Sequence, residues 1–143
     1  MQLISLTLLL PSLVAAATYN VTHVIKRAEE QYERVVASLA LGKQYPIEGH
    51  MMGQWRFSPN YWTDGFFAGV LWQLYDHTKK DIWRQRAIQA TDGLFEDQFI
   101  TQHHDIGFMV MGSYGEGYRV TKNETYKPII INAVNHRLHF ADQ

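Results

Sequence analysis

Apolar segments with helical spacing are joined alternately by long loops and short turns, and this alternation limits the folds open to the chain. Five segments have apolar residues three and four positions apart, the period of an α-helix: residues 20–41, 64–77, 81–97, 108–114 and 124–140. A long loop rich in proline and glycine separates the first segment from the second, and a short turn separates the second from the third. Because short connections join antiparallel helices, we expect an all-α protein of αα-hairpins whose long loops gather at one end.

Composition and charge narrow the class of protein and of partner. The chain has 143 residues, enough for one domain, and its apolar fraction of 46% is ordinary for a globular protein. A formal net charge of −1 gives no electrostatic reason to expect nucleic acid or an anionic membrane as a partner. There is no cysteine, so no disulfide supports the core. The sequence also lacks a glycine-rich phosphate loop, and we expect no cofactor.

The start of the chain has the pattern of a secretory signal peptide. An apolar stretch is followed by Ala15-Ala16-Ala17, the small residues that signal peptidase requires. We therefore expect residues 1–17 to be removed, and residues 18–143 to form one secreted domain without a membrane segment. Glycosylation sequons at Asn20 and Asn123 agree with secretion. The alternative is a buried N-terminal helix, because the basic residues that usually precede the apolar stretch are missing.

Two short motifs stand where long loops lead into apolar helices. They are Trp62-Thr63-Asp64-Gly65-Phe66-Phe67 and His103-His104-Asp105-Ile106-Gly107-Phe108. A carboxylate at such a place can cap the helix, because it accepts hydrogen bonds from the free amides of the first turn. It can also lie at the floor of a sugar-binding cleft, where it orients water or binds a hydroxyl group. Both interpretations are open for Asp105, whereas capping fits Asp64 better.

Aromatic residues crowd around the first motif, and some of them lie in loop rather than helix. Helical spacing predicts core packing for Phe66, Phe67 and Trp72, whereas Trp62 and Trp55 lie in the preceding loop, where rings can stack on sugars. The adjacent histidines of the second motif cannot both reach one ion easily, and no third ligand stands at a suitable spacing. We therefore expect no metal site.

Together these motifs resemble those of the unsaturated glucuronyl hydrolases, glycoside hydrolase family 88. The resemblance rests on the run from Trp62 to Trp72 and on the second motif, and it extends over roughly residues 19–140. It implies an (α/α)6 barrel of αα-hairpins, of which about five helices are present, so the expected fold is an incomplete barrel. It also implies removal of 4,5-unsaturated glucuronic acid from oligosaccharides that polysaccharide lyases release.

The resemblance assigns one of the two carboxylates that the family uses. In this chemistry an acid protonates the enol-ether double bond, water adds at the adjacent carbon, and the hemiketal opens and expels the sugar. The resemblance implies Asp105 as a catalytic carboxylate, with Trp62 and His104 contacting the substrate. It places the proton donor on a later helix, and Asn132, in a superficially similar context, is an amide and not an acid. We therefore expect a fragment of such a hydrolase that is inactive alone.

Other functions are open from the sequence. A secreted helical module could bind sugars without catalysis through the loop residues Trp55, Tyr61 and Trp62. Alternatively, the apolar helix faces that an incomplete barrel leaves uncovered could pair with another protein or with a second copy of the chain. The rhamnogalacturonyl hydrolases are an alternative within the same class of enzyme, and the second motif fits them less well.

Overall fold

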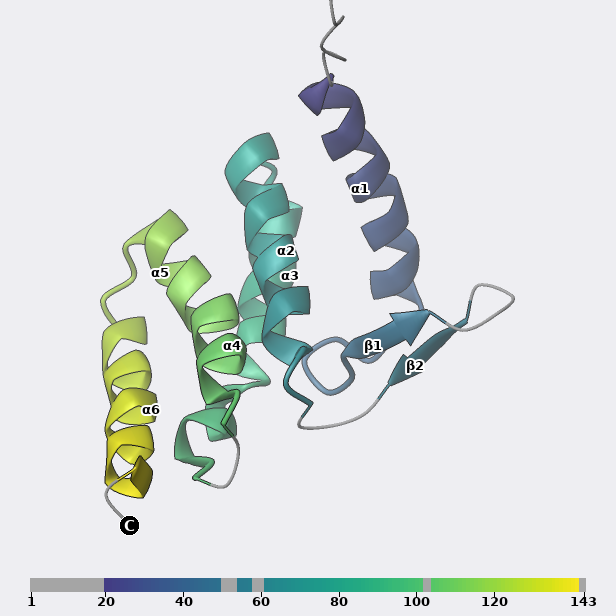
Figure 1. Ribbon diagram of the computed structural model, residues 1–143. Helices are drawn as coiled ribbons and strands as arrows, with labels where there is room; N and C mark the ends of the chain where they lie inside the picture. Colours follow the sequence, from purple (N-terminus) through teal and green to yellow (C-terminus); the bar gives the residue numbers. More distant parts are fainter. Residues whose placement is uncertain (1–19, 50–53, 58–60, 102–103, 142–143) are drawn as a thin grey trace, which may run out of the picture.

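The computed structural model describes residues 20–49, 54–57, 61–101 and 104–141, and it is mainly helical (Figure 1). The predicted signal peptide, residues 1–17, lies outside the described residues. The elements, in chain order, are α1 (Val21–Ala37), β1 (Pro46–Gly49), β2 (Trp55–Phe57), α2 (Asp64–Thr78), α3 (Asp81–Asp92), the 3₁₀ helix η1 (Phe95–Phe99), α4 (Ile106–Val110), the π-helix η2 (Met111–Gly115), α5 (Glu116–Thr121) and α6 (Tyr126–Ala141).

The predicted αα-hairpins are confirmed. A short turn joins α2 to α3, and Lys79 ends α2 in the left-handed conformation, with φ of 56°. A second short connection joins α5 to α6, and it begins at Lys122, also with φ of 56°. Pro128 falls in the first turns of α6, as expected, because proline is tolerated where backbone amides lack an intrahelical partner. None of the described helices combines the length and apolar character needed to cross a membrane.

The long loop before α2 contains a small antiparallel sheet that we did not expect. Strands β1 and β2 pair with Pro46 opposite Phe57 and Gly49 opposite Trp55, with an irregularity after Pro46. An ion pair between Arg56 and Glu48, at 3.1 Å, crosses the strands. The strands are too short to show an alternating pattern in the sequence, which is why only a loop was predicted.

Elements α4, η2 and α5 form one unbroken helical run, so the prediction that this helix ends at residue 114 is wrong. Gly115 has helical dihedral angles, with φ of −63° and ψ of −47°. Gly117 serves packing and not termination, because a Cβ atom there would lie 2.7 Å from the Tyr126 ring and 3.0 Å from the Trp72 ring. With this run counted once and the short 3₁₀ helix η1 left aside, the described residues contain the expected five helices.

Helix α2 lies at the centre of the core. Phe67, Leu71, Trp72 and Leu74 are buried, so most sides of this helix are enclosed. The buried Trp72 indole donates to Thr91 Oγ1 at 2.9 Å and so ties α2 to α3.

Glycines let α2 approach the helix α4–η2 at backbone contact. A Cβ atom at Gly65 would collide with the carbonyl oxygens of Met109 and Phe108, and one at Gly69 would lie 2.6 Å from the carbonyl oxygen of Gly112. Both helices begin at the end of the molecule that carries β1 and β2 (Figure 1). The two sequence motifs are therefore brought to the same end of the helical layer.

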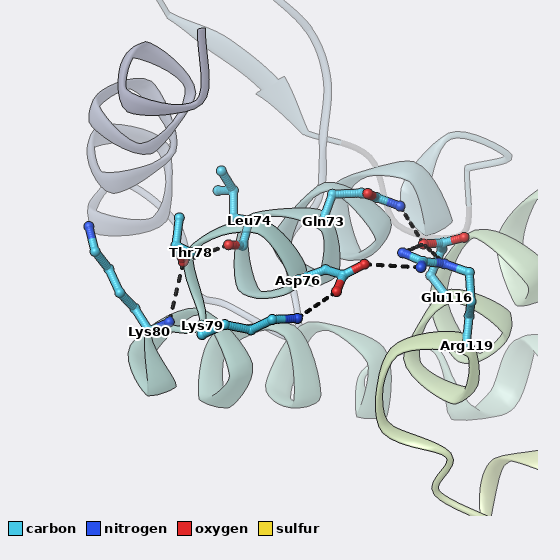
Figure 2. Close-up of polar contacts among 8 residues, drawn as sticks. All are labelled: Gln73, Leu74, Asp76, Thr78, Lys79, Lys80, Glu116 and Arg119. Carbon is cyan, nitrogen blue, oxygen red and sulfur yellow. Dashed lines mark hydrogen bonds and ion pairs between the residues drawn. The ribbon is translucent and has the colours of Figure 1, made fainter. Parts of the chain in front are cut away.

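A polar network joins α2 to α5 near the opposite end of α2 (Figure 2). Asp76 pairs with Lys79 at 2.7 Å and with Arg119 at 3.0 Å, and Arg119 also reaches Glu116 at 3.0 Å. Glu116 in turn accepts from Gln73 at 2.5 Å. These side chains are partly exposed, and such pairs contribute roughly 0–1 kcal/mol each, so the network aligns α2 and α5 more than it stabilises them.

Candidate active site

The first motif forms a tight turn that leads into α2. Tyr61 N donates to Asp64 Oδ2 at 2.9 Å, and Asp64 N donates to the Tyr61 carbonyl at 2.9 Å. Thr63 occupies the N-cap position, but its side chain makes no capping hydrogen bond. Asp64 is fully buried, and its carboxyl therefore holds the turn that carries Trp62 rather than capping α2 in the ordinary way.

The second motif places Asp105 at the N-cap of α4. The backbone carbonyl of Asp105 accepts from Phe108 N at 2.8 Å, but the side chain makes no capping hydrogen bond. Instead, Asp105 Oδ2 lies 3.2 Å from His104 Nε2. The carboxyl is 17% exposed and the imidazole 79% exposed. Asp105 therefore occupies the N-cap position, but its side chain contacts His104 instead of capping the helix.

Three rings from the two motifs touch one another. Trp62 lies 5.9 Å from Phe66 and 6.0 Å from Phe108 between ring centroids, and Phe66 lies 5.7 Å from Phe108. We call these three residues the aromatic cluster. Phe66 is 42% and Phe108 50% exposed, so the prediction that Phe66 packs in the core is wrong. Phe67 and Trp72 are buried as predicted.

Two residues of the aromatic cluster, Phe66 and Phe108, line a groove between α2 and the helix α4–η2, whereas Trp62 is not part of its described lining. The groove has a volume of about 390 Å³, and its lining includes Phe66, Phe108, Met111 and Glu116. A larger groove of about 790 Å³ lies on the other side of Phe66, between α1, the small sheet and α2, and Trp55 lines it. Only the smaller groove is lined by residues of both motifs, which makes it the better candidate for a substrate cleft.

Several known proteins of similar sequence and fold are unsaturated glucuronyl hydrolases. Over 77 residues, 52% of this chain and 20% of the relative, the sequence is 34% identical to an unsaturated glucuronyl hydrolase of Bacillus sp. (strain GL1). Over 74 residues, 50% of this chain and 18% of the relative, it is 40% identical to an unsaturated glucuronyl hydrolase of Formosa agariphila. The crystal structure of an unsaturated glucuronyl hydrolase specific for heparin matches with a TM-score of 0.73 and 31% identity. No protein-family model matches the chain.

The chain is similar to part of an unsaturated glucuronyl hydrolase. It spans about a fifth of the length of the curated relatives it matches. The match to the heparin-specific structure covers 80% of this chain and 31% of that chain. The resemblance read from the two motifs is confirmed, and so is the all-α hairpin fold of the α/α barrel type. The roles of Asp105, Trp62 and His104 stay predictions.

Sequence reasoning missed a second buried carboxyl group, which interacts electrostatically with Asp64. Asp97, in η1, is 3% exposed, and burial, with Asp64 adding to it, raises the pKa of Asp97 to about 7. Burial likewise raises the pKa of Asp64 to about 6. Both groups can hold a proton near neutral pH, but both are enclosed and cannot touch a sugar as they stand. Asp97 is the last residue of the helix predicted over residues 81–97, and nothing in the local sequence indicates its burial.

Two further points from the sequence concern Asn132 and metal binding. Asn132 donates to Gln98 Oε1 at 3.1 Å and so ties α6 to η1. Among the described residues, no three histidine or acidic side chains converge in a way that could hold a metal ion. His103 lies outside the described residues, so the predicted pair of adjacent histidines is described only at His104.

Proposed function

We propose that this chain supplies part of the active site of a secreted glycoside hydrolase that removes 4,5-unsaturated glucuronic acid from lyase-generated oligosaccharides. The observation that carries the proposal is the aromatic cluster. It joins the two motif helices at the end where Asp105 stands, and two of its rings, Phe66 and Phe108, line a groove. Rings that are half exposed at a groove suit the apolar faces of sugars. The name of the relatives states the unsaturated glucuronyl group on which they act.

Each predicted site residue has a role that its surroundings allow. Asp105, partly buried beside His104, would orient the water that adds to the double bond. A charged carboxylate at the N-terminus of a helix interacts favourably with the helix dipole, which suits water positioning. Trp62 would stack on the uronic acid ring, and the exposed His104 imidazole would donate to a substrate oxygen.

Asp105 is the only residue of this chain that the resemblance assigns to catalysis. We therefore propose that the chain alone does not turn over substrate, because the enol-ether step also needs an acid that donates a proton to the double bond. Loss of ultraviolet absorbance from an unsaturated disaccharide measures turnover directly. Measurable loss with the purified chain, abolished by Asp105→Asn, would show that it already contains the acid.

Binding tests the site without requiring turnover. We expect an unsaturated heparin or chondroitin disaccharide to change the tryptophan fluorescence saturably. We expect Trp62→Ala to weaken that binding by about tenfold, since a stacked ring contributes on the order of 1–2 kcal/mol. Trp55→Ala is the matched control, because it removes a second tryptophan, which is exposed and lies outside the aromatic cluster.

The outcome separates the functions that the sequence leaves open. Loss of binding in Trp62→Ala but not in Trp55→Ala supports the proposed cleft. The reverse pattern would place a sugar in the larger groove and favour a non-catalytic binding module. Absence of binding to any of these sugars would contradict both.

A further inference from the structure

The turn that carries Trp62 is closed by Asp64 at both ends. The Asp64 amide donates to the carbonyl of Tyr61, and the Asp64 carboxyl accepts from the amide of Tyr61, each at 2.9 Å. These two bonds enclose Trp62 and Thr63. The hydroxyl of Thr63 has no hydrogen-bond partner among the described residues, so it adds no further bond there.

Asp64 is also held in place by the residue that follows it. Gly65, which follows it, lies in backbone contact with Met109 and Phe108 of the neighbouring helix. The start of α2 therefore cannot shift without moving α4. Because Asp64 connects this fixed point to the Trp62 turn, its carboxyl sets where the Trp62 ring stands relative to Phe108.

We propose that Asp64 is a positioning residue, which holds the Trp62 ring against Phe66 and Phe108 and so fixes the sugar-stacking surface. The positional part follows from the contacts alone, and the consequence for sugar binding rests on the proposed function. A buried carboxyl suits this task, because a hydrogen bond to a charged or strongly polarised acceptor in a dry environment is stronger than one exposed to water.

The groups that face Asp64 include two other acids. Asp97 of η1 and Tyr45, which precedes β1, both interact electrostatically with it. Tyr45 donates to the Ala90 carbonyl at 2.6 Å. Burial raises the pKa of Asp64 to about 6, so its charge changes in mildly acidic solution. The Tyr61 amide, which donates to this carboxyl, should report that change.

Nuclear magnetic resonance tests the proposal on the whole protein. In the wild type we expect the Tyr61 amide proton shift to titrate with a midpoint near pH 6, and we expect contacts between the Trp62 and Phe108 rings to be visible. Asp64→Asn keeps an acceptor oxygen but no charge, so it should retain the ring contacts and lose the titration. Asp64→Ala should lose the ring contacts and speed exchange of the Tyr61 amide by about tenfold or more.

Asp97→Ala is the matched control. It removes a second buried carboxyl of the same neighbourhood, but no hydrogen bond to the Trp62 turn. We expect it to keep the ring contacts and the slow Tyr61 exchange. Ring contacts and exchange in Asp64→Ala equal to those of the wild type would overturn the proposal. If Asp64→Ala does not fold, the wild type decides: a Tyr61 amide proton shift that does not change between about pH 4 and 8 would overturn the proposal.

Sugar binding separates this inference from the function on which it rests. We expect Asp64→Ala to raise the Kd for the unsaturated disaccharide by about fivefold or more, and Asp64→Asn to leave it within about twofold. If the wild type binds no disaccharide, the proposed function fails. The ring contacts and amide exchange then still decide whether Asp64 holds Trp62.

Discussion

Two carboxyl groups are buried in the core, and no described contact pairs either of them with a positively charged side chain. Asp64 Oδ1 and Asp97 Oδ2 are buried atoms without a hydrogen-bond partner among the described residues. Removing a carboxylate from water is costly, so burial favours the protonated form of both groups. Asp105 is less enclosed, because it contacts His104 and its carboxyl is 17% exposed.

The two buried carboxyls make stability depend on pH. Their pKa values rise from 3.8 to about 6 for Asp64 and to about 7 for Asp97, so the folded state binds these protons more tightly than the unfolded chain. The free energy of unfolding should therefore fall as the pH rises from about 4 to about 8, by on the order of a few kcal/mol. Below this range the protein should weaken again, because Lys79 and Arg119 lower the pKa of Asp76.

Urea unfolding at several pH values measures this dependence. We expect Asp97→Asn to flatten the fall between about pH 5 and 8. Asp81→Asn, a change at an exposed carboxylate, should leave the slope unaltered. An unfolding free energy that rises over this range in the wild type would contradict the burial of these carboxyls.

At the scale of elements, hydrophobic periodicity predicted the positions of the helices, because these depend on local sequence. The helix expected over residues 64–77 is observed as Asp64–Thr78, and the one expected over 20–41 as Val21–Ala37. The helix expected over 81–97 ends at Asp92, and η1 replaces its last turn. The continuous run through η2 and the burial of Asp97 could not be predicted, because both depend on which rings and helices pack against them.

The close crossing of α2 and α4 is an element-scale feature with a direct test. Gly65→Ala would drive a methyl group into two carbonyl oxygens of the neighbouring helix. We expect a loss of stability of about 3 kcal/mol, since backbone cannot move aside as a side chain can. Gly107 is a helical glycine with nothing within 4 Å of the position of an added Cβ atom. Gly107→Ala should therefore be neutral or stabilise by up to about 1 kcal/mol.

Chemical denaturation of the two variants compares them on one scale. If α2 and α4 are in backbone contact at Gly65, the denaturation midpoint of Gly65→Ala should be clearly lower than that of Gly107→Ala. Equal midpoints would mean that the helices are farther apart than the structure places them.

At the scale of the whole molecule, several helices present apolar residues to solvent. Ile131 and Val134 of α6 are 56% and 51% exposed, and Phe108 and Met111 of the neighbouring run are exposed as well. The solved relatives are about three times longer than the part that matches here. Resemblance at the level of two motifs identified the fold family, but it could not show which faces of this chain are open.

These faces lead us to propose that the purified chain associates with itself. Sedimentation velocity should show a dimer or larger species whose fraction grows with concentration. The double change Ile131→Glu with Val134→Glu should shift the protein towards monomer, because charged groups oppose burial of that face. Ile82→Glu, at an exposed site on α3, is the control. A wild type that is monomeric at all concentrations would contradict the proposal.

The most direct test of the proposed site is turnover by a hybrid enzyme. Residues 20–141 would replace the structurally matching part of the Bacillus sp. (strain GL1) hydrolase, which would supply the rest of the barrel. We expect the folded hybrid to consume an unsaturated disaccharide, followed as loss of ultraviolet absorbance. Asp105→Asn should lower its kcat by about a hundredfold or more, whereas Asp97→Asn should change it little. A folded, active hybrid in which Asp105→Asn has no effect would contradict the assignment of this site.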